Sequence, residues 1–266
     1  MSTAEQVSVD VREVTREEIS EYRENGWALL RRLISPDSAG ELLAILKDRM
    51  GENGDERMNT PPNARNLAAF AKWYRLDDES PLFHALRHNP QLGRNSALLM
   101  GRDMPIRSLT TLAAVKLPKD SELDRSKGVT EWHQDHMSTP AKCTSLGFWL
   151  ALDEITPEMG PMRFRNGSHR AGLLTPPMED WELLGDYPLS EPLHLMPGDA
   201  TAHSSLVVHG AGLNESRRPR WGYIINTFPA DAPYVPYPTT HTEGIEDQLT
   251  PGKPLDHPRF PLIYTP

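Results

Sequence analysis

Short apolar runs separated by turn residues dominate the chain from Ser108 onward. Each run is rich in leucine, β-branched or aromatic side chains, and proline, glycine and aspartate occupy the intervals between the runs. The runs are Leu109 to Leu117, Thr130 to His133, Thr144 to Leu152, Met162 to Arg165, Ala200 to Val208 and Trp221 to Phe228. This spacing predicts a mainly β protein whose strands form a double-stranded β-helix, or jelly roll.

The first part of the chain has helical signals instead. Thr15-Arg16-Glu17-Glu18 has the form of a capping box at a helix start, and Ser35-Pro36 offers an N-cap serine before a proline at the first helical position. The second of these helices is expected to end near Gly51. A third helical region is predicted over Asn66 to Leu86, limited by Pro81. These N-terminal helices are expected to buttress the jelly roll.

Two loops and the C-terminal part of the chain have no periodic pattern. The loops Gly51 to Asn66 and Thr175 to Glu191 are long, and the second, which carries the aromatic residues Trp181 and Tyr187, is the stronger candidate for a lid over the open end of the barrel. After Phe228 the chain is rich in proline. We expect this tail to be too irregular for the core, and to pack along the barrel wall or across the mouth of the site.

Composition narrows the classes of partner. The chain has 266 residues, of which 38% are hydrophobic, so one domain spanning residues 1–266 can bury a sizeable core. A net charge of -9 disfavours binding to nucleic acid, to anionic membranes or to an acyl-CoA, each of which needs a basic surface. Cys143 is the only cysteine and no apolar run is long enough for a membrane span, which favours a cytoplasmic protein. We expect a monomer or homodimer.

His133 and Asp135 are the first candidates for metal chemistry. In an extended strand the two side chains point the same way, because side chains alternate between faces. His209 follows the apolar run Ser204 to Val208, which is predicted to be a strand that this histidine ends. Two imidazoles and one carboxylate are the ligand set that suits non-haem iron(II). Eleven residues after His209 comes Arg220, whose guanidinium can pair with a carboxylate.

Several motifs together resemble one family, the phytanoyl-CoA dioxygenases, which are iron(II)/2-oxoglutarate oxygenases. They are Trp132-His133-Gln134-Asp135, Gly167-Ser168-His169, Gly198-Asp199, His209-Gly210 and the interval from His209 to Arg220. The resemblance implies that His133, Asp135 and His209 bind iron and that Arg220 holds the distal carboxylate of 2-oxoglutarate. It also implies that Trp149 lies near this co-substrate. A serine found two residues after the distal histidine in some members is Ala211 here.

Other residues near these motifs are alternatives. Strand parity points His136 away from Asp135, and His169 and His203 are expected to be structural. Arg218 shares its predicted face with Arg220 and is the second candidate for the carboxylate. Trp132 is either a core aromatic or a wall of the site.

The resemblance implies an enzyme that uses Fe(II), 2-oxoglutarate and O2 to oxidise a C–H bond of a small-molecule substrate. Hydroxylation is the expected outcome, and cyclisation, desaturation or epimerisation by the same chemistry are alternatives. Halogenation is not expected, because halogenating relatives lack the carboxylate that Asp135 provides. A jelly-roll protein that binds a metal without redox chemistry is the remaining alternative. The acidic composition suggests a neutral or cationic substrate.

Overall fold

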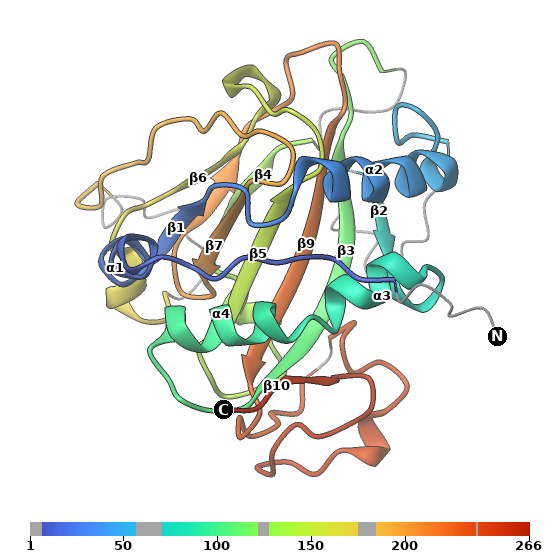
Figure 1. The fold of residues 1–266 in the computed structure, drawn as a ribbon. Coiled ribbons are helices and arrows are strands. Elements are labelled where there is room, and N and C mark those ends of the chain that lie inside the picture. The colour runs from blue at the N-terminus through green and yellow to red at the C-terminus, as the bar shows by residue number, and fades with distance from the viewer. Residues whose placement is uncertain (1–6, 57–70, 122–127, 175–184, 238) are drawn as a thin grey trace, which may run out of the picture.

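Two antiparallel β-sheets and a layer of helices make up the fold (Figure 1). The computed structural model describes residues 7–56, 71–121, 128–174, 185–237 and 239–266. The helices are α1 (Arg16–Asn25), α2 (Pro36–Met50), α3 (Pro81–Arg87) and α4 (Pro90–Met100). The strands are β1 (Trp27–Leu30), β2 (Ala71–Tyr74), β3 (Ile106–Lys116), β4 (Thr130–His133), β5 (Leu146–Ala151), β6 (Met162–Phe164), β7 (Ala200–Ser204), β8 (His209–Ala211), β9 (Arg220–Pro229) and β10 (Leu262–Tyr264).

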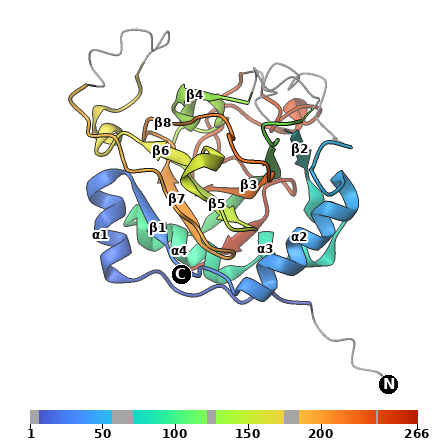
Figure 2. The ribbon, with the colours of Figure 1, turned by 90° about the horizontal axis from the view of Figure 1, so that it is seen from above.

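The strand order is that of a jelly roll. The larger sheet runs β1-β7-β5-β9-β3-β10, with β2 also paired to β3, and the smaller sheet runs β4-β8-β6. Viewed from above, helices α1 to α4 lie along one side of the larger sheet, and β4, β6 and β8 lie on its other side (Figure 2). The prediction of a mainly β jelly roll with N-terminal helices is therefore confirmed.

The helix starts follow the capping residues. The Thr15 hydroxyl accepts from the Glu18 amide at 3.2 Å, and the Glu18 carboxylate accepts from the Thr15 amide at 2.8 Å, which satisfies two amides at the start of α1. At the start of α2 the Ser35 hydroxyl accepts from the Ser38 amide at 3.0 Å. Helix α4 was not predicted, although Asn89 caps it and Pro90 opens it. No described helix is long and apolar enough to cross a membrane.

The predicted third helix over Asn66 to Leu86 is wrong for most of its described part. Residues Ala71–Tyr74 form β2, which pairs antiparallel with β3, and only the segment from Pro81 is α-helical. Cross-strand pairing to the long strand β3 overrides the mixed local pattern of apolar and charged residues. The residues before Ala71 in this range lie outside the described part of the chain.

The predicted strand Ala200 to Val208 is also divided in the structure. Strand β7 ends at Ser204, where the hydroxyl accepts from the Leu206 amide at 3.2 Å and the carbonyl from the Val207 amide at 3.0 Å. These bonds close a turn that carries the chain from the larger sheet to the smaller one. His209 therefore begins strand β8 and does not end a strand.

The two faces of the larger sheet bury different kinds of side chain. Trp221, Tyr223 and Ile225 of β9 face the helices and join the main hydrophobic cluster. The Tyr223 ring lies 4.7 Å from the ring of Phe83 in α3, measured between centroids. Alternate residues of each strand point to the other side of the sheet, toward β4, β6 and β8. We call this side the inner face.

Cross-strand partners on the inner face lie at the same height along the barrel, and we call each such row of partners a level. At one level the cross-strand partners are Thr110, Asn226, Gly147 and His203, from β3, β9, β5 and β7. The next level contains Leu112, Ile224, Trp149 and Thr201. The partners Lys116 and Arg220 lie at the far end of the face. Along the barrel the inner face thus changes from polar side chains, through a mainly apolar level, to two basic side chains.

The C-terminal tail packs along the wall of the barrel, which is one of the two positions predicted for it. It also forms a hydrophobic cluster of its own, contrary to the prediction that it is too irregular for the core. The cluster contains Leu109, Ala141, Phe228, Ala232, Tyr234, Ile245, Leu249, Leu255 and Phe260. The tail lacks periodicity because turns and isolated bridges, rather than helices or long strands, bring its apolar residues together.

Truncation of Phe260 tests whether this cluster stabilises the protein. Phe260 is fully buried and its ring meets Phe228 edge-on at 6.0 Å between centroids. We expect Phe260→Ala to lower the free energy of unfolding by about 3 to 5 kcal/mol, because burial is lost and a cavity remains. Urea denaturation measures the change. Leu262→Ala, at a side chain that is 49% exposed, is the control and should cost less than about 1 kcal/mol.

Candidate metal centre

His133 and His209 face each other across a strand pair. His133 ends β4, His209 begins β8, and the two are Cα partners whose ring centroids lie 4.3 Å apart. In each ring Nδ1 lies against the carbonyl oxygen two residues earlier, at 2.7 Å from Glu131 and 3.1 Å from Val207. A carbonyl only accepts hydrogen bonds, so Nδ1 carries the proton in each neutral ring. Nε2 of both rings then offers its lone pair to a metal.

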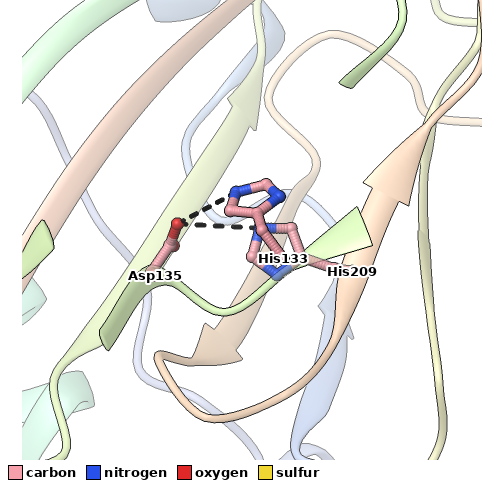
Figure 3. Close-up of side chains that lie close together, drawn as sticks. All are labelled: His133, Asp135 and His209. Carbon is pink, nitrogen blue, oxygen red and sulfur yellow. Dashed lines mark ion pairs between the residues drawn. The ribbon is translucent and has the colours of Figure 1, made fainter. Parts of the chain in front are cut away.

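Asp135 completes a cluster of three ligand side chains. Gln134 is extended, so His133 and Asp135 project to the same side even though Asp135 starts a 3-10 turn, Asp135–Ser138, and does not continue β4. Asp135 Oδ1 lies 3.3 Å from Nε2 of His133 and 3.8 Å from Nε2 of His209. The three side chains point toward one another (Figure 3), and their ligand atoms all lie within 4.8 Å of one another.

Burial and neighbouring charges shift the pKa values of Asp135 and His209 in the directions that favour binding of a cation. Burial alone raises the pKa of Asp135, but the attraction of His209 and hydrogen bonds from His133 and His203 outweigh it and hold this pKa well below its usual value. Burial, then the neighbouring charge of His133, lowers the pKa of His209 to about 3. At neutral pH the cluster therefore contains an ionised carboxylate and a neutral His209, the protonation states that metal binding requires.

His203 also belongs to this cluster, although its sequence position suggested a structural role. Its Nε2 lies 3.1 Å from Asp135 Oδ2, the carboxylate oxygen that does not face His133. The imidazole is 3% exposed and comes from the same level of the inner face as Gly147. A Cβ atom on Gly147 would lie 2.9 Å from His203 Nε2, so only glycine leaves room for this ring. The feature of the sequence that could have indicated this role is the glycine at position 147 in β5, which lies opposite His203 in β7.

Arg220 and Trp149 lie together at the other end of the inner face. The guanidinium carbon is 4.9 Å from the centroid of the Trp149 ring, and Nη1 donates to the Gly160 carbonyl. Arg220 is 2% exposed, and its Nε is buried without a hydrogen-bond partner in the described part of the chain. Burial lowers the pKa of Arg220 to about 9. A buried guanidinium with donors to spare is suited to an anionic ligand.

Lys116 is a second buried basic side chain beside Arg220, and the sequence alone did not single it out. The two residues are direct cross-strand partners, and Lys116 Nζ donates to the Ala211 carbonyl at 3.0 Å and to that of Gly212. Burial, then the charge of Arg220, lowers the pKa of Lys116 to about 6. Among the described residues no carboxylate forms an ion pair with either side chain. At neutral pH Lys116 is therefore largely uncharged beside Arg220, and an anion bound between the two side chains would favour its charged form.

The other residues that the sequence offered as alternatives lie outside the cluster of three ligands. Arg218 is half exposed and lies 3.3 Å from the Glu154 carboxylate, so it is a surface ion pair and Arg220 is the better placed arginine. Trp132 packs over Gly210, and the Arg165 guanidinium carbon lies 5.4 Å from its ring. His169 lies against Gly26 at the end of α1, which agrees with a structural role. His136 is not one of the three clustered ligands.

The two candidate lid loops are only partly described. Most of Gly51 to Asn66 and the first part of Thr175 to Glu191 lie outside the described residues. Which of them covers the site therefore stays a prediction.

One curated protein has a related sequence. The dioxygenase olcK of Penicillium canescens is 31% identical over 120 residues, which are 41% of this chain and 36% of that protein. The alignment spans about a third of the fungal enzyme, so it does not show that this chain has the activity of the whole fungal enzyme.

Solved structures match over most of the chain. The epimerase SnoN of nogalamycin biosynthesis, solved in complex with Fe3+, alpha ketoglutarate and nogalamycin RO, is 25% identical with a TM-score of 0.72, over 93% of this chain and 97% of that chain. The carbocyclase SnoK from the same biosynthesis is 22% identical with a TM-score of 0.73, over 94% and 96% of the two chains. EctD of S. alaskensis shares the fold at 16% identity and a TM-score of 0.65, over 86% and 83%.

A family model settles the relationship that these likenesses suggest. The model described as Phytanoyl-CoA dioxygenase (PhyH) matches residues 22–222, a stretch that includes the clustered ligands, the two buried basic side chains and Trp149. With this match, the jelly roll and the His-Asp-His cluster, the chain belongs to the phytanoyl-CoA dioxygenase family.

Proposed function

We propose that the protein is an iron(II)/2-oxoglutarate-dependent dioxygenase that oxidises a C–H bond of a small molecule. The observation that carries the proposal is the convergence of His133 Nε2, His209 Nε2 and Asp135 Oδ1 within 4.8 Å of one another. Two imidazoles and a carboxylate on one side of a metal leave its other positions open, the arrangement that non-haem iron oxygenases use.

The donor atoms of this cluster fit iron(II). His133 and His209 offer their Nε2 nitrogens, and Asp135 offers one oxygen while its other oxygen accepts a hydrogen bond from His203. This hydrogen bond favours binding of the metal through Oδ1 alone, because Oδ2 is already engaged. When bound, iron with 2-oxoglutarate and O2 supplies the oxidising power that removes hydrogen from a C–H bond.

Arg220 and Lys116 are proposed to hold the distal carboxylate of 2-oxoglutarate, with Trp149 as a wall beside it. Lys116 binds the carbonyl of Ala211, which lies two residues beyond His209 in β8. Two strand residues span about 7 Å, which suits a five-carbon dicarboxylate that reaches from the metal to the cations. Arg220 can donate two parallel hydrogen bonds in such a pair, and the bound carboxylate favours the protonated form of Lys116, which then adds a point charge.

Hydroxylation is the proposed outcome, and epimerisation or cyclisation is the alternative that one observation favours. SnoN is an epimerase, SnoK is a carbocyclase, and both share this fold over more than nine-tenths of the chain. Which outcome follows depends on how the substrate is oriented after hydrogen removal. A cytoplasmic location also stays a prediction.

Formation of succinate tests the proposed function. We expect the protein, loaded with Fe(II) under nitrogen and then given 2-oxoglutarate, ascorbate and air, to release succinate even without its substrate. The same protein loaded with Zn(II) should release none, because zinc has no redox chemistry. If the iron-loaded protein forms no succinate above a metal-free control, the metal-binding protein without redox chemistry becomes the correct interpretation.

A further inference from the structure

A cavity of about 230 Å³ lies beside β3 where neither β2 nor β10 covers that strand. Strand β2 pairs with residues Leu112 to Val115 and β10 pairs near Ile106, so the segment between them is uncovered. Tyr74, at the end of β2, and Thr110 line the cavity on the barrel side. His241 and Arg259, from the C-terminal tail, line it on the other side.

This cavity adjoins the inner face on the side of Asp135. Thr110 is at the same level of the inner face as His203, which contacts Asp135. His241 is half-buried, and the charge of Asp135 acts on it: burial lowers the pKa of His241 to about 4, and Asp135 opposes that shift. The tail segment before His241 is fixed to the turn that carries Asp135, because the Tyr237 hydroxyl donates to the Met137 carbonyl at 2.7 Å.

The opposite end of the inner face is assigned to the co-substrate, an assignment that rests on the proposed function. Lys116 and Arg220 lie there, and Asp135, His203 and Asn226 lie at the other end. A substrate must reach the metal from the side that 2-oxoglutarate leaves open. The cavity beside Thr110 lies on that side.

The cavity is lined mainly by hydrogen-bonding and cationic groups. Arg75, Arg87 and Arg259 contribute guanidinium groups, and Glu243 contributes a carboxylate. Arg87 is already neutralised by Asp77 at 2.5 Å. Arg259 donates to the carbonyls of His241 and Glu243 and forms no ion pair within the described ranges.

Arg75 and Arg259 lack a close carboxylate partner among the described residues: Arg75 lies 3.6 Å from Asp78, and Arg259 forms no ion pair. Burial, and then the charge of Arg75, lowers the pKa of Arg259, while the charges of Glu246, Glu243 and Asp78 oppose that shift, so the two guanidinium groups lie near each other and near carboxylates. Arg75 is a non-glycine residue in the left-handed region, with φ 57, and its contact with Asp78 is 3.6 Å long. A strained backbone of this kind is often retained where a side chain serves a ligand.

Asn226 supplies a further unused group on the inner face. Its Oδ1 is buried and has no hydrogen-bond partner in the described part of the chain. A Cβ atom on Gly147 would lie 2.8 Å from this oxygen and 2.9 Å from His203 Nε2, so Asn226 projects next to the group that contacts Asp135. A hydroxyl of a ligand would satisfy this acceptor.

We propose that this cavity is the substrate site and that it selects a small hydroxylated carboxylic acid. The carboxylate lies between Arg75 and Arg259, and the hydroxyl groups reach Thr110 and Asn226 near the metal. This replaces the expectation of a neutral or cationic substrate, which was drawn from the charge of the whole chain and not from the charge of the site.

Two probe pairs test the proposal: D-glucuronate against D-glucose, and 4-hydroxybenzoate against 4-hydroxybenzamide. Each pair keeps its ring and removes the negative charge. The protein is loaded with Mn(II) and saturating 2-oxoglutarate, and broadening of the probe's proton NMR signals reports binding close to the metal. We expect at least one acid to bind about fivefold or more tightly than its neutral partner, since charge-assisted hydrogen bonds are lost in the neutral form.

Substitutions of the cavity arginines then test whether the acid binds in this cavity. Arg75→Gln should weaken the acid by about fivefold or more, and Arg75→Gln combined with Arg259→Gln should weaken it further. Arg94→Gln, at an exposed arginine paired with Glu13 at 3.3 Å, is the matched control and should change nothing. Arg75→Gln alone keeps the test valid if loss of the Arg259 contacts unfolds the tail, and the melting temperature of each variant checks this.

Three results overturn the proposal: no probe is broadened, the neutral partners bind as well as the acids, or Arg75→Gln binds like the parent protein. Binding of Mn(II) and 2-oxoglutarate is measured on the same samples. If these fail to bind, the proposed function fails and the substrate proposal falls with it. If they bind normally and the probes give any of the three results, only the substrate proposal is wrong.

Discussion

Asp135→Ala abolishes iron binding and succinate formation while leaving the fold intact. The substitution removes the only anionic group among the three clustered ligands and leaves His133, His209 and His203 around a site without negative charge. Loss of a group that merely orients a metal ligand costs about 10- to 100-fold in affinity or activity, so loss of the ligand itself should cost more than about 100-fold. His133→Ala and His209→Ala should do the same.

Metal analysis by mass spectrometry after anaerobic loading measures this effect. The matched control is Asp231→Ala, an exposed aspartate in the C-terminal tail, which should keep iron near stoichiometry. Urea denaturation shows whether each variant is folded. Near-stoichiometric iron together with parental succinate formation in any of the three ligand variants would mean that the ligand set is misassigned.

Arg220→Leu raises the concentration of 2-oxoglutarate needed for half-maximal succinate formation. The variant leaves the distal carboxylate with Lys116 alone in a buried site, at a cost of roughly 2 to 5 kcal/mol. Lys116→Met should produce a smaller increase, because a lysine gives one point charge where the arginine gives a fork of donors. Titration of succinate formation against 2-oxoglutarate at fixed iron measures both.

Arg218→Leu is the control for this series. Arg218 is half exposed and paired with Glu154, so its removal should leave the 2-oxoglutarate requirement within about twofold of the parent. A large effect at Arg218 and none at Arg220 would move the co-substrate carboxylate to the surface arginine. Equal iron contents in all three variants ensure that the measurement concerns 2-oxoglutarate.

The position of Asp135 could be predicted from the sequence, and part of its local structure could not. Parity placed Asp135 on the same side as His133, and this held because Gln134 alone is extended. Strand β4 ends at His133, as the predicted run Thr130 to His133 does, and Asp135 lies beyond it at the start of a 3-10 turn. Parity across one extended residue needs no longer strand.

Strand boundaries and long-range partners could not be predicted in the same way. Nothing in the apolar run Ala200 to Val208 reveals that the Ser204 hydroxyl bonds to the backbone and turns the chain from one sheet to the other. His203 and Lys116 owe their roles to partners on other strands, Gly147 and Arg220, and such pairing depends on register. The cluster in the C-terminal tail was missed because its apolar residues meet through turns.

The pairing of His133 with His209 also has a consequence for how the protein acquires its metal. The two histidines lie on short strands that are far apart in the chain, and β8 is held between β4 and β6. Contacts of this kind pay a large loop-closure entropy, so they form after the local hairpins and helices of a folding chain. We expect the metal ligands to come together late, so that iron is captured by a nearly finished barrel and cannot guide the early steps of folding.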